Sequence, residues 1–374
     1  MRITGDWLHH PGTQAVLDLL APGAFAVGGC VRNDLMGVPV SDIDIATDLV
    51  PDDVIARAKK AGLRVIPTGY DHGTVTIIAN DLPHEVTTFR RDVKTDGRHA
   101  VVRFSTDLAD DARRRDFTMN ALYADSAGRV HDPLNGLPDL LARRVRFIED
   151  PARRIAEDHL RILRFFRFHA WYGDPAGGIG AEGLAACAAA VDGIAQLSAE
   201  RVTGELLKLL SAPDPAPAVA AMTQAGVLNA VLPGSDARFL PVLVHLEGGQ
   251  SDPLARLAIL GGETGDLRLS RKETAVLNLL RDGMANTTPA AALAHDHGAD
   301  LARTIATLRA AQFETPLPDT LEHDLQTGAN AVFPISAADL MPEFQGPALG
   351  AELRRLKKRW VKSGFALTRA DLLQ

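Results

Sequence analysis

The chain has 374 residues and a formal net charge of −7, with 46% hydrophobic and 23% charged residues. This balance excludes wholesale disorder, and at roughly 150 residues per domain the length predicts two or three domains. No apolar run reaches the roughly 18 residues that a membrane-spanning helix needs, so we expect no membrane association. Cys30 and Cys187 are the only cysteines, too few for a disulfide framework, which favours a cytoplasmic protein.

The first 140 residues combine short β-branched stretches with turns, a pattern typical of strands separated by helices. We expect these strands to lie in one sheet. They are predicted at residues 24–27, 43–45, 75–78, 86–89 and 101–104.

After about residue 150 the pattern becomes helical. Ile155, His159, Ile162 and Phe166 follow a 4-3-4 spacing, which predicts one stripe of a helix. A second helix is predicted from Ser198, and segments rich in proline and glycine separate the later helices. The sequence therefore predicts an α/β head followed by an all-helical body.

Two aspartates follow a glycine turn. In Asp42-Ile43-Asp44 the two acidic side chains are two residues apart, so on a strand they point to the same face. Two adjacent carboxylates suit a pair of hard cations that stabilise the attacking and leaving oxygens of a phosphoryl displacement. A single Asp-x-Asp is more often a solvated turn, so the aspartates alone do not establish a site.

Gly28-Gly29 precedes a predicted helix start. Glycine lets backbone N–H groups approach a phosphate, and the helix N-terminus favours negative charge. Arg32 lies one turn into this helix and can reach the same phosphates. Two glycines commonly mark only a turn, but glycines, arginine and aspartates in this order favour a nucleotide site.

Five motifs in order resemble those of the class II polymerase-β-like nucleotidyltransferases, the family of bacterial tRNA CCA-adding enzymes and poly(A) polymerases. One departure is Asn33, where that family usually has aspartate. The resemblance extends from about residue 24 to 210. The motifs are GGCVR with DIDIAT (28–32 and 42–47), RRRDFTMNAL (113–122), DPLNGLPDL (132–140), EDHLRILR (157–164) and SAER (198–201).

The resemblance implies an α+β fold in three parts. Residues 1–140 are expected to form the polymerase-β-like catalytic head, a mixed sheet with helices. Residues 141–212 are expected to form a helical neck with the nucleotide-templating helix, and residues 213–374 a helical body and tail that bind tRNA.

Asp158 and Arg161 are three residues apart and are predicted to be neighbours on one helix. A carboxylate that accepts from an amino group, beside a guanidinium that donates to a ring nitrogen, matches the pairing edges of cytosine and adenine and opposes those of guanine and uracil. The resemblance implies this base-selecting role. The alternative is an intrahelical ion pair that contributes about 0.2–0.5 kcal/mol.

The resemblance also implies nucleotide contacts by four further residues. Arg164 and Arg167 are expected to bind the triphosphate and base, although a solvated basic face is the alternative. Arg115 and Asp116 are expected to line the ribose and phosphate side, where Asp116 could accept from a ribose hydroxyl and favour ribonucleotides. Alternatively, Asp116 only orients the neighbouring Arg113 or Arg114.

Two nearby features are less specific. Glu85 lies on a predicted neighbouring strand, where it either completes a carboxylate triad or, as the preferred interpretation, faces solvent on an edge strand. Residues 90–98 are charged and turn-rich, which predicts a mobile loop. In the resembling family, a loop here is linked to the switch from C to A addition.

Two basic segments suit contact with an RNA backbone. Residues 143–167 contain eight arginines and four acidic residues. Near the C-terminus six cations surround Trp360, although an exposed helix face is the alternative; they are Arg354, Arg355, Lys357, Lys358, Arg359 and Lys362.

The resulting hypothesis is a cytoplasmic tRNA nucleotidyltransferase that adds CCA to tRNA from CTP and ATP, with two Mg²⁺ held by Asp42 and Asp44. One alternative is a bacterial poly(A) polymerase or an enzyme that adds only A. An alternative of another class is a non-catalytic tRNA-binding protein on the same scaffold. The sequence leaves the oligomeric state open.

Overall fold

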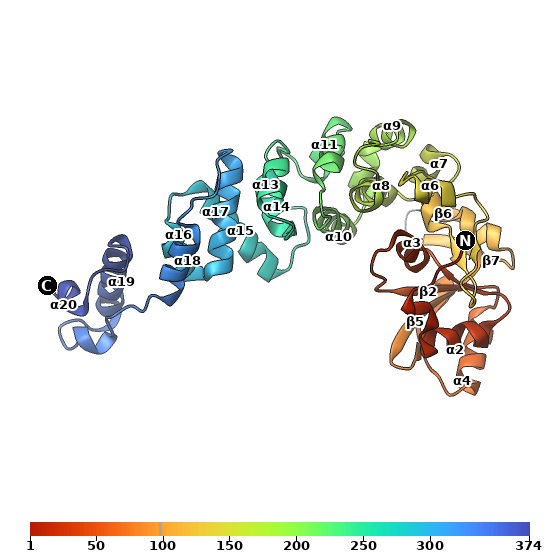
Figure 1. The fold of residues 1–374 in the computed structure, drawn as a ribbon, viewed down its shortest axis with the longest axis horizontal. Helices are drawn as coiled ribbons and strands as arrows, with labels where there is room; N and C mark the ends of the chain where they lie inside the picture. The colour runs from red at the N-terminus through yellow and green to blue at the C-terminus, as the bar shows by residue number, and fades with distance from the viewer. Residues whose placement is uncertain (97–98) are drawn as a thin grey trace. The chain divides into compact units, whose positions relative to one another are not determined.

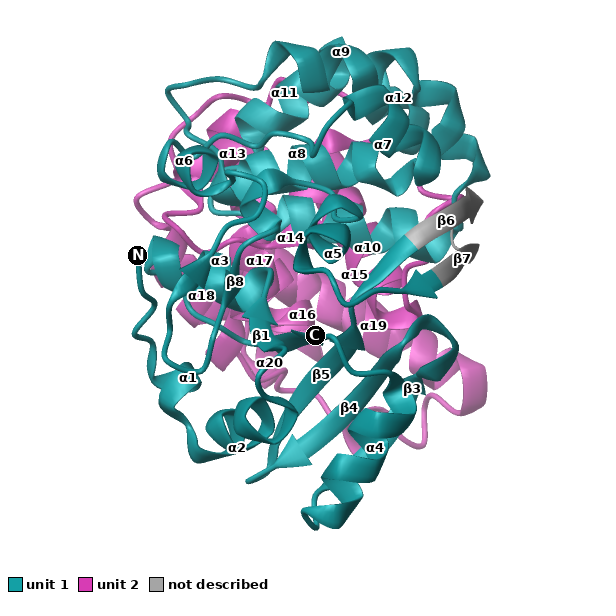
Figure 2. Ribbon diagram, turned by 90° about the vertical axis from the view of Figure 1, so that its right-hand side faces the viewer, with its two compact units in different colours: residues 1–233 teal, residues 234–374 magenta. Residues whose placement is uncertain are grey.

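The computed structural model describes residues 1–96 and 99–374. These form two compact units, residues 1–233 and 234–374, which Figure 2 colours separately. Among the described residues, no helix combines the length and the apolar character needed to cross a bilayer.

The first unit contains a seven-stranded mixed sheet in the order β3-β4-β5-β2-β1-β8-β9. At its centre β2 pairs antiparallel with β1 and parallel with β5. Helices α2 and α4 pack against the sheet (Figure 2). The strands are β1 (Ala24–Val27), β2 (Ile43–Thr47), β3 (Arg64–Gly69), β4 (Thr74–Ala79), β5 (Leu82–Thr88), β8 (Tyr123–Ala124) and β9 (Val130–His131).

The sheet is followed by helices, as Figure 1 shows. The α+β prediction is therefore confirmed. The helices of the first unit are α1 (Asp6–His9), α2 (Pro11–Leu20), α3 (Gly29–Met36), α4 (Pro51–Lys60), α5 (Leu108–Arg113), α6 (Leu137–Leu141), α7 (Pro151–Glu157), α8 (Leu160–Tyr172), α9 (Ala181–Ala189), α10 (Ala199–Leu210), α11 (Ala216–Gln224) and α12 (Val227–Val231). Short 3-10 turns occupy Tyr70–His72, Thr118–Asn120 and Val191–Gln196.

The prediction of a single sheet is wrong at one position. Residues 101–104 belong to β7 (His99–Phe104), which pairs with β6 (Arg90–Asp96) in a separate two-stranded sheet. The loop predicted for residues 90–98 is correspondingly wrong for 90–96, while 97 and 98 lie outside the described residues. Charged residues rarely signal a strand in a sequence, because strand preference depends strongly on the pairing partner.

The predicted continuous helix through Ile155 and Phe166 is also wrong. Helix α7 ends at Glu157, Asp158 has an extended backbone (φ −158°, ψ 106°), and α8 begins at Leu160. Ile155 and Phe166 are nevertheless both fully buried. The apolar spacing continues across the two-residue break, so periodicity alone could not reveal it.

Aromatic side chains anchor α8 beside the sheet. Phe165 stacks on Phe147 with ring centroids 5.3 Å apart, and Phe168 lies 4.8 Å from Phe117. All four rings are buried. Phe117 lies between α5 and β8 of the head, and Phe147 pairs with it through an isolated antiparallel bridge. This packing therefore fixes the polar face of α8 relative to the strands.

The second unit is entirely helical in its described elements. A small core at its C-terminal end includes Trp360, which is 3% exposed and lies 5.3 Å from the ring of His295. Its elements are α13 (Leu240–Leu246), α14 (Pro253–Leu260), α15 (Arg271–Ala285), α16 (Ala290–His297), α17 (Ala299–Gln312), α18 (Leu321–Asn330), a 3-10 turn (Ala337–Leu340), α19 (Gly346–Lys362) and α20 (Arg369–Leu372).

Candidate nucleotide-transfer site

The glycine turn joins β1 to α3. Gly28 has φ 71° and ψ −117°, a backbone conformation that side-chain-bearing residues rarely adopt, and a Cβ there would meet Arg115 Nη1 at 3.3 Å. Helix α3 begins at Gly29, so its first backbone N–H groups lie where this turn ends. The turn therefore offers unobstructed donors to a phosphate.

The two aspartates lie at the start of β2. Asp42 directly precedes the strand and Asp44 is its second residue. Ser41 Oγ donates a hydrogen bond to Asp42 Oδ2 at 2.8 Å. On the neighbouring parallel strand, Glu85 lies in register with Asp44. Three carboxylates thus lie on adjacent positions of two central strands.

The structure corrects the prediction that Glu85 lies on an edge strand. Strand β5 lies between β4 and β2, so Glu85 is not on an edge strand, although it is exposed as expected. A single-sequence reading cannot give strand order, because the parallel pairing of β5 with β2 joins residues about 40 positions apart. The register places Glu85 beside the aspartate pair.

The chemistry of this carboxylate group suits a divalent cation. Burial and the nearby Glu85 carboxylate raise the pKa of Asp44 to about 6, only partly offset by Arg115. Uncompensated negative charge of this kind is what a hard cation neutralises. Within the described residues, no three histidine, cysteine, aspartate or glutamate side chains are already arranged around a common metal position.

A cavity of about 630 Å³ brings together every residue predicted for the site. It lies between the strands of the head and helices α8 and α10. The predicted residues that line it are Gly28, Gly29, Arg32, Asp42, Asp44, Arg115, Asp116, Asp158, Arg161, Arg164 and Arg167, joined by Arg114, Asn120, Leu160, Phe168, Arg201 and Lys208.

Arg32 is held in the wall of this cavity by uncharged partners. Its guanidinium lies 3.9 Å from the centroid of the Tyr172 ring, and Nη2 donates to the Tyr172 hydroxyl and to Asn33 Oδ1, each at 2.8 Å. Arg32 also bonds to Asn120. Burial lowers the pKa of Arg32. An amide at position 33 therefore orients the arginine without neutralising it.

Asp116 is buried and bonded to Arg164. Its Oδ2 accepts from Arg164 Nε at 2.8 Å, and its Oδ1 accepts from Asn120 Nδ2 at 2.9 Å. Burial on its own raises the pKa of Asp116, but Arg164 and these hydrogen bonds hold that pKa at about 2. The alternative that Asp116 orients Arg113 or Arg114 is wrong, because these arginines pair with Asp110 at 3.6 Å and with Asp111 at 2.6 Å.

Arg115 also depends on Asp111. Its Nη2 donates to Asp111 Oδ2 at 2.9 Å, and its Nε donates to the Tyr123 hydroxyl at 3.1 Å. Asp111 is completely buried. Sequence reasoning missed Asp111 and Asn120, although both lie within or beside the second motif.

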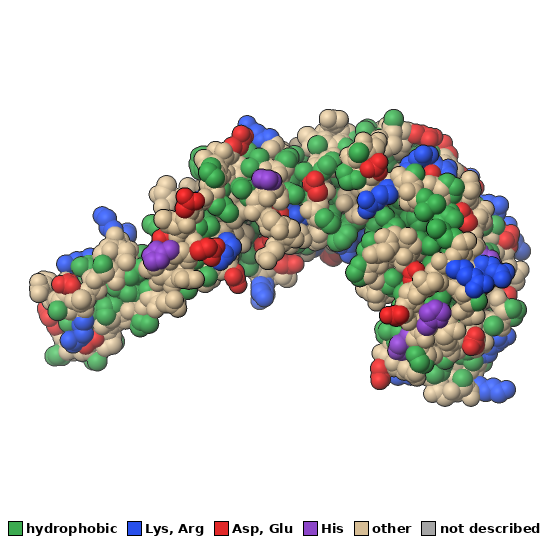
Figure 3. Space-filling view, in the orientation of Figure 1, with side chains coloured by type: hydrophobic (Ala, Val, Ile, Leu, Met, Phe, Trp, Pro, Cys, Tyr) green, Lys and Arg blue, Asp and Glu red, His purple; other side chains and the backbone are tan. Residues whose placement is uncertain are grey.

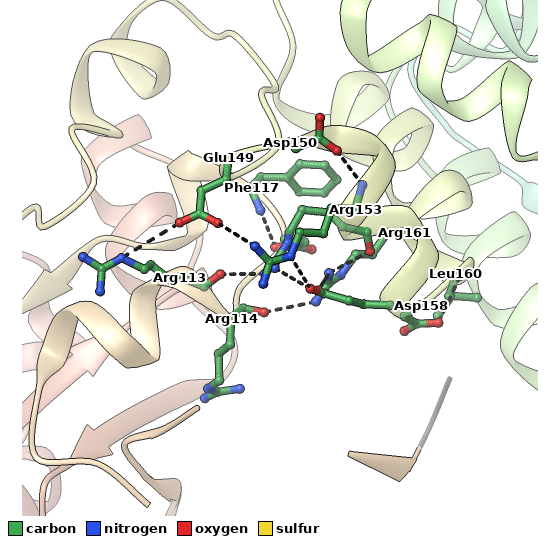
Figure 4. Close-up of polar contacts among 12 residues, drawn as sticks. Arg113, Arg114, Phe117, Glu149, Asp150, Arg153, Asp158, Leu160 and Arg161 are labelled. Atoms are coloured by element: carbon green, nitrogen blue, oxygen red, sulfur yellow. Dashed lines mark hydrogen bonds and ion pairs between the residues drawn. The ribbon is translucent and has the colours of Figure 1, made fainter. Parts of the chain in front are cut away.

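The base-selecting pair departs from its predicted geometry. Asp158 precedes α8 rather than lying on it, and its carboxylate accepts from Arg201 Nη2 at 2.6 Å. Arg161 Nη1 donates to Glu157 Oε2 at 2.7 Å, and Nη2 donates to the carbonyl of Arg114 at 3.0 Å (Figure 4). The simpler alternative, an intrahelical Asp158–Arg161 ion pair, is wrong, because among the described residues Arg161 pairs with Glu157 and Asp158 pairs with Arg201.

Arg164 and Arg167 are not a solvated basic face. Arg167 Nε donates to Glu205 Oε2 at 2.6 Å, and Glu205 is 6% exposed. The guanidinium carbons of Arg164 and Arg167 lie 5.3 and 4.9 Å from the centroid of the Phe168 ring. Arg32 approaches the same ring at 5.1 Å, so three cations gather around one aromatic ring at the cavity wall.

A mixed sheet carrying paired aspartates, a glycine turn and a basic helical wall defines a nucleotidyltransferase of the polymerase-β-like class. The family model described as "Poly A polymerase head domain" matches residues 24–146. A second, "Probable RNA and SrmB- binding site of polymerase A", matches residues 179–239.

Comparison with curated relatives narrows the family to which the chain belongs. It is 34% identical over 369 residues to CCA tRNA nucleotidyltransferase 1, mitochondrial, of Mus musculus and likewise to that of Homo sapiens, covering 92% of this chain and 84% of each relative. The CCA-adding enzyme of Geobacillus stearothermophilus is 38% identical over 217 residues, which cover 56% of this chain and 51% of that protein. The chain therefore belongs to the CCA tRNA nucleotidyltransferase family.

Solved structures agree with this assignment. The Bacillus stearothermophilus CCA-adding enzyme in complex with CTP superposes with a TM-score of 0.76 at 26% identity, covering 94% of this chain and 92% of that one. The Thermotoga maritima CCA-adding enzyme complexed with tRNA has a TM-score of 0.71 at 18% identity, covering 99% of this chain and 97% of that one. The latter likeness supports the fold alone.

Proposed function

We propose that the protein adds CCA to the 3′ end of tRNA, transferring CMP and then AMP from CTP and ATP and releasing pyrophosphate. The observation that supports this most directly is the single cavity in which the glycine turn, the paired aspartates and the Asp158 and Arg161 side chains meet. The residues proposed for chemistry and those proposed for base selection thus line one cavity.

Asp42 and Asp44 are the proposed ligands of two divalent cations, and we assign Mg²⁺. When bound, these cations would lower the pKa of the RNA 3′-hydroxyl and neutralise the leaving pyrophosphate. Ser41 orients Asp42 through its hydroxyl. Glu85, in register with Asp44, is proposed as a third carboxylate of the site.

Triphosphate binding is assigned to the glycine turn and the arginines. The backbone N–H of Gly29 at the start of α3 would donate to phosphate oxygens, whereas that of Gly28 already donates to the carbonyl of Leu122 at 3.1 Å. Arg32, Arg164 and Arg167 would supply positive charge. All three guanidinium groups pack against Phe168, and Arg164 and Arg167 are also paired with Asp116 and Glu205. These contacts fix the positions of the cations before a triphosphate binds.

Ribose contacts are assigned to Arg115 and Asp116. The low pKa of Asp116 keeps its carboxylate ionised, so it can accept from a ribose hydroxyl while bonded to Arg164. This would favour ribonucleotides over deoxyribonucleotides.

For base selection, both Asp158 and Arg161 must give up or share a hydrogen-bond partner within the protein. To accept from the amino group of cytosine or adenine, Asp158 must share its carboxylate with Arg201, which now holds it at 2.6 Å. To donate to the ring nitrogen, Arg161 must share or leave Glu157. A correct base replaces the bonds that are given up, whereas guanine or uracil leaves these groups unpaired at a cost of about 1–3 kcal/mol for each group.

Acceptor RNA is assigned to the helical part of the chain. In α19 the side chains of Arg354, Lys358, Arg359 and Lys362 are exposed. Arg355 and Lys357 are instead paired with Glu352 and Asp296. Figure 3 shows acidic side chains interspersed with the basic ones on the visible face of this segment. The RNA contact is therefore proposed for four exposed cations of α19, namely Arg354, Lys358, Arg359 and Lys362.

Two further assignments, the cellular compartment and the domain boundaries, accompany this function. Both cysteines are free and buried, which is compatible with the reducing cytoplasm that we propose as the compartment. We keep the boundaries at residues 140 and 212 for head, neck and body. The break between compact units falls further on, after Pro233.

A product ladder tests the proposed function. The protein is incubated with tRNA that lacks its terminal CCA, and each nucleoside triphosphate is offered singly and then together. We expect two C additions with CTP alone and one further A when ATP is added. The matched family descriptions also name poly(A) polymerase, and long tracts of A from ATP alone would favour that activity. Extension that persists unchanged in Asp42→Ala would contradict the assigned catalytic aspartates.

A further inference from the structure

We propose that a second cavity receives the 3′-terminal nucleotide of the acceptor RNA, with its base stacked on Trp171. This cavity has a volume of about 380 Å³ and lies at the C-terminal ends of α8 and α10. Arg167 and Lys208 line both it and the transfer cavity, so the two are adjacent. The inference rests on the proposed function and adds to it the binding site of the growing end.

Trp171 is placed as a stacking surface. It is partly exposed on the last turn of α8, and its Nε1 donates to the carbonyl of Lys208 at 2.7 Å. That bond joins α8 to α10 and fixes the indole, so the ring does not lose further freedom when a base packs on it. Tyr172 lines the same cavity with its ring centroid 6.5 Å from that of Trp171.

Stacking is the mode of recognition that this substrate needs. During CCA addition the terminal nucleotide changes after each transfer, so a site that read the edge of one base would reject the next acceptor. An aromatic ring accepts every base, because each base presents a π face. The acceptor site would therefore tolerate any sequence, while the transfer cavity selects the incoming base.

The charges around the cavity suit one RNA backbone. Lys208 is exposed, and within the described part of the chain no carboxylate lies within ion-pair distance of its ammonium group. Arg167, which is paired with Glu205 at 2.6 Å, adds a second cation at the junction of the two cavities. A phosphate that links the terminal nucleotide to its neighbour would meet these side chains.

The cavity also leads to the proposed catalytic carboxylates. Ser41 lines it and donates to Asp42 at 2.8 Å. Along α8, Arg161 and Trp171 are ten residues apart, a rise of about 15 Å. That separation leaves room between the selected base and the stacked acceptor base for the reacting sugar and phosphate groups. Asp42 lines the transfer cavity and is bonded to Ser41 of the second cavity, so it lies where the two cavities adjoin.

A comparison of two RNAs tests this site without nucleotide or metal. One is tRNA that lacks CCA, and the other is the same RNA with its unpaired 3′-terminal nucleotide also removed. For the unaltered protein we expect trimming to weaken binding by about tenfold, as loss of one stacked base would. In Trp171→Ala the trimming penalty should fall below about twofold, and Trp171→Phe should restore most of it.

Controls separate stacking from folding and from the proposed function. Phe313→Ala removes an aromatic side chain that is 68% exposed in the other unit and should keep the full trimming penalty. Binding of CTP should be unchanged in Trp171→Ala, which shows that the transfer cavity is intact. Because no chemistry occurs in this assay, its result is independent of whether the product ladder ends in CCA.

Two outcomes would overturn the assignment. One is an equal trimming penalty in Trp171→Ala and the unaltered protein. The other concerns the variants Lys208→Gln and Trp171→Ala. It is a change in the inhibition of CCA addition by pyrophosphate in either variant, while trimming of the RNA still weakens binding as it does in the unaltered protein. The second result would assign the cavity to the leaving group instead of to the acceptor RNA.

Discussion

Arg161 is held by Glu157, the last residue of the preceding helix α7, and not by Asp158. Arg161 Nη1 lies 2.7 Å from Glu157 Oε2, while Asp158 is bonded to Arg201 at 2.6 Å. The two side chains assigned to base selection thus have separate supports, one on α7 and one on α10. Each can be fixed independently at the edge of the cavity before a nucleotide arrives.

Replacement of Arg161 should therefore affect selection more than affinity. We expect Arg161→Ala to reduce the preference for CTP over UTP by roughly tenfold or more, because a donor that opposes uracil is removed. Binding of the triphosphate should weaken much less. The measurement is kcat/KM for CTP and UTP with the same tRNA acceptor.

Arg238→Ala is the matched control, since Arg238 does not line the transfer cavity and its side chain is 69% exposed and paired with Asp236. It should retain the CTP preference. An equal loss for all four nucleotides in Arg161→Ala would contradict a base-selecting role.

The Tyr172 hydroxyl should support triphosphate binding through Arg32. Tyr172→Phe keeps the ring that lies 3.9 Å from the guanidinium but removes the acceptor of a buried hydrogen bond. One such bond contributes about 1 kcal/mol, so KM for CTP should rise about fivefold with little change in kcat. A change confined to KM for tRNA would show that the hydroxyl serves the acceptor instead.

Asp111 should make folding sensitive to acid. Burial alone raises its pKa, but Arg115 and Arg114 lower it to about 2, below the ordinary value of 3.8. A depressed carboxylate pKa stabilises the folded state above about pH 4, and this contribution is lost as the pH falls toward 2. The expected loss is about 2 kcal/mol in the free energy of unfolding.

Denaturant unfolding between pH 5 and pH 2.5 measures this contribution. The Asp111→Asn variant should be less stable at pH 5 and should have a shallower pH dependence. If the variant and the unaltered protein lose stability in parallel, the Asp111–arginine cluster is not the source of the acid sensitivity.

Binding of tRNA should fall steeply with salt. Each phosphate contact that is removed should reduce the slope of log K against log salt concentration by close to one unit. We expect Lys358→Gln and Arg359→Gln together to flatten the slope by about two units. Arg303→Gln, in which an arginine paired with Glu322 at 2.8 Å is changed, should leave it unaltered. A slope that is already flat in the unaltered protein would contradict the proposed backbone contacts.

The sequence predicted residues that line one cavity, but it did not predict the hydrogen bonds and ion pairs among them. Glycine turns and an Asp-x-Asp at a strand start are local features, so Gly28 and Asp42 could be placed from neighbouring residues alone. The partners of Asp158 and Arg32 could not, because Arg201 and Tyr172 lie 43 and 140 positions away in the chain. Such contacts exist only once α8, α10 and the head have packed together.

For the fold as well, local features could be predicted from the sequence, whereas features that depend on distant residues could not. The strand at 24–27 and the helix after Ser198 follow from local patterns and are confirmed. Strand order is not local, and Glu85 was assigned to an edge for that reason. The break at Asp158 was missed because its flanking residues keep the apolar spacing on both sides. That break is what turns Asp158 away from the helix and toward Arg201.

A structure of the protein with bound CTP tests the central claim most directly. The cytosine amino group and ring nitrogen should lie within hydrogen-bonding distance of Asp158 and Arg161, with the α-phosphate beside Asp42 and Asp44. A CTP molecule bound in the same cavity with its base edge facing away from Asp158 and Arg161, or with its α-phosphate far from the aspartates, would contradict protein-directed selection at this site.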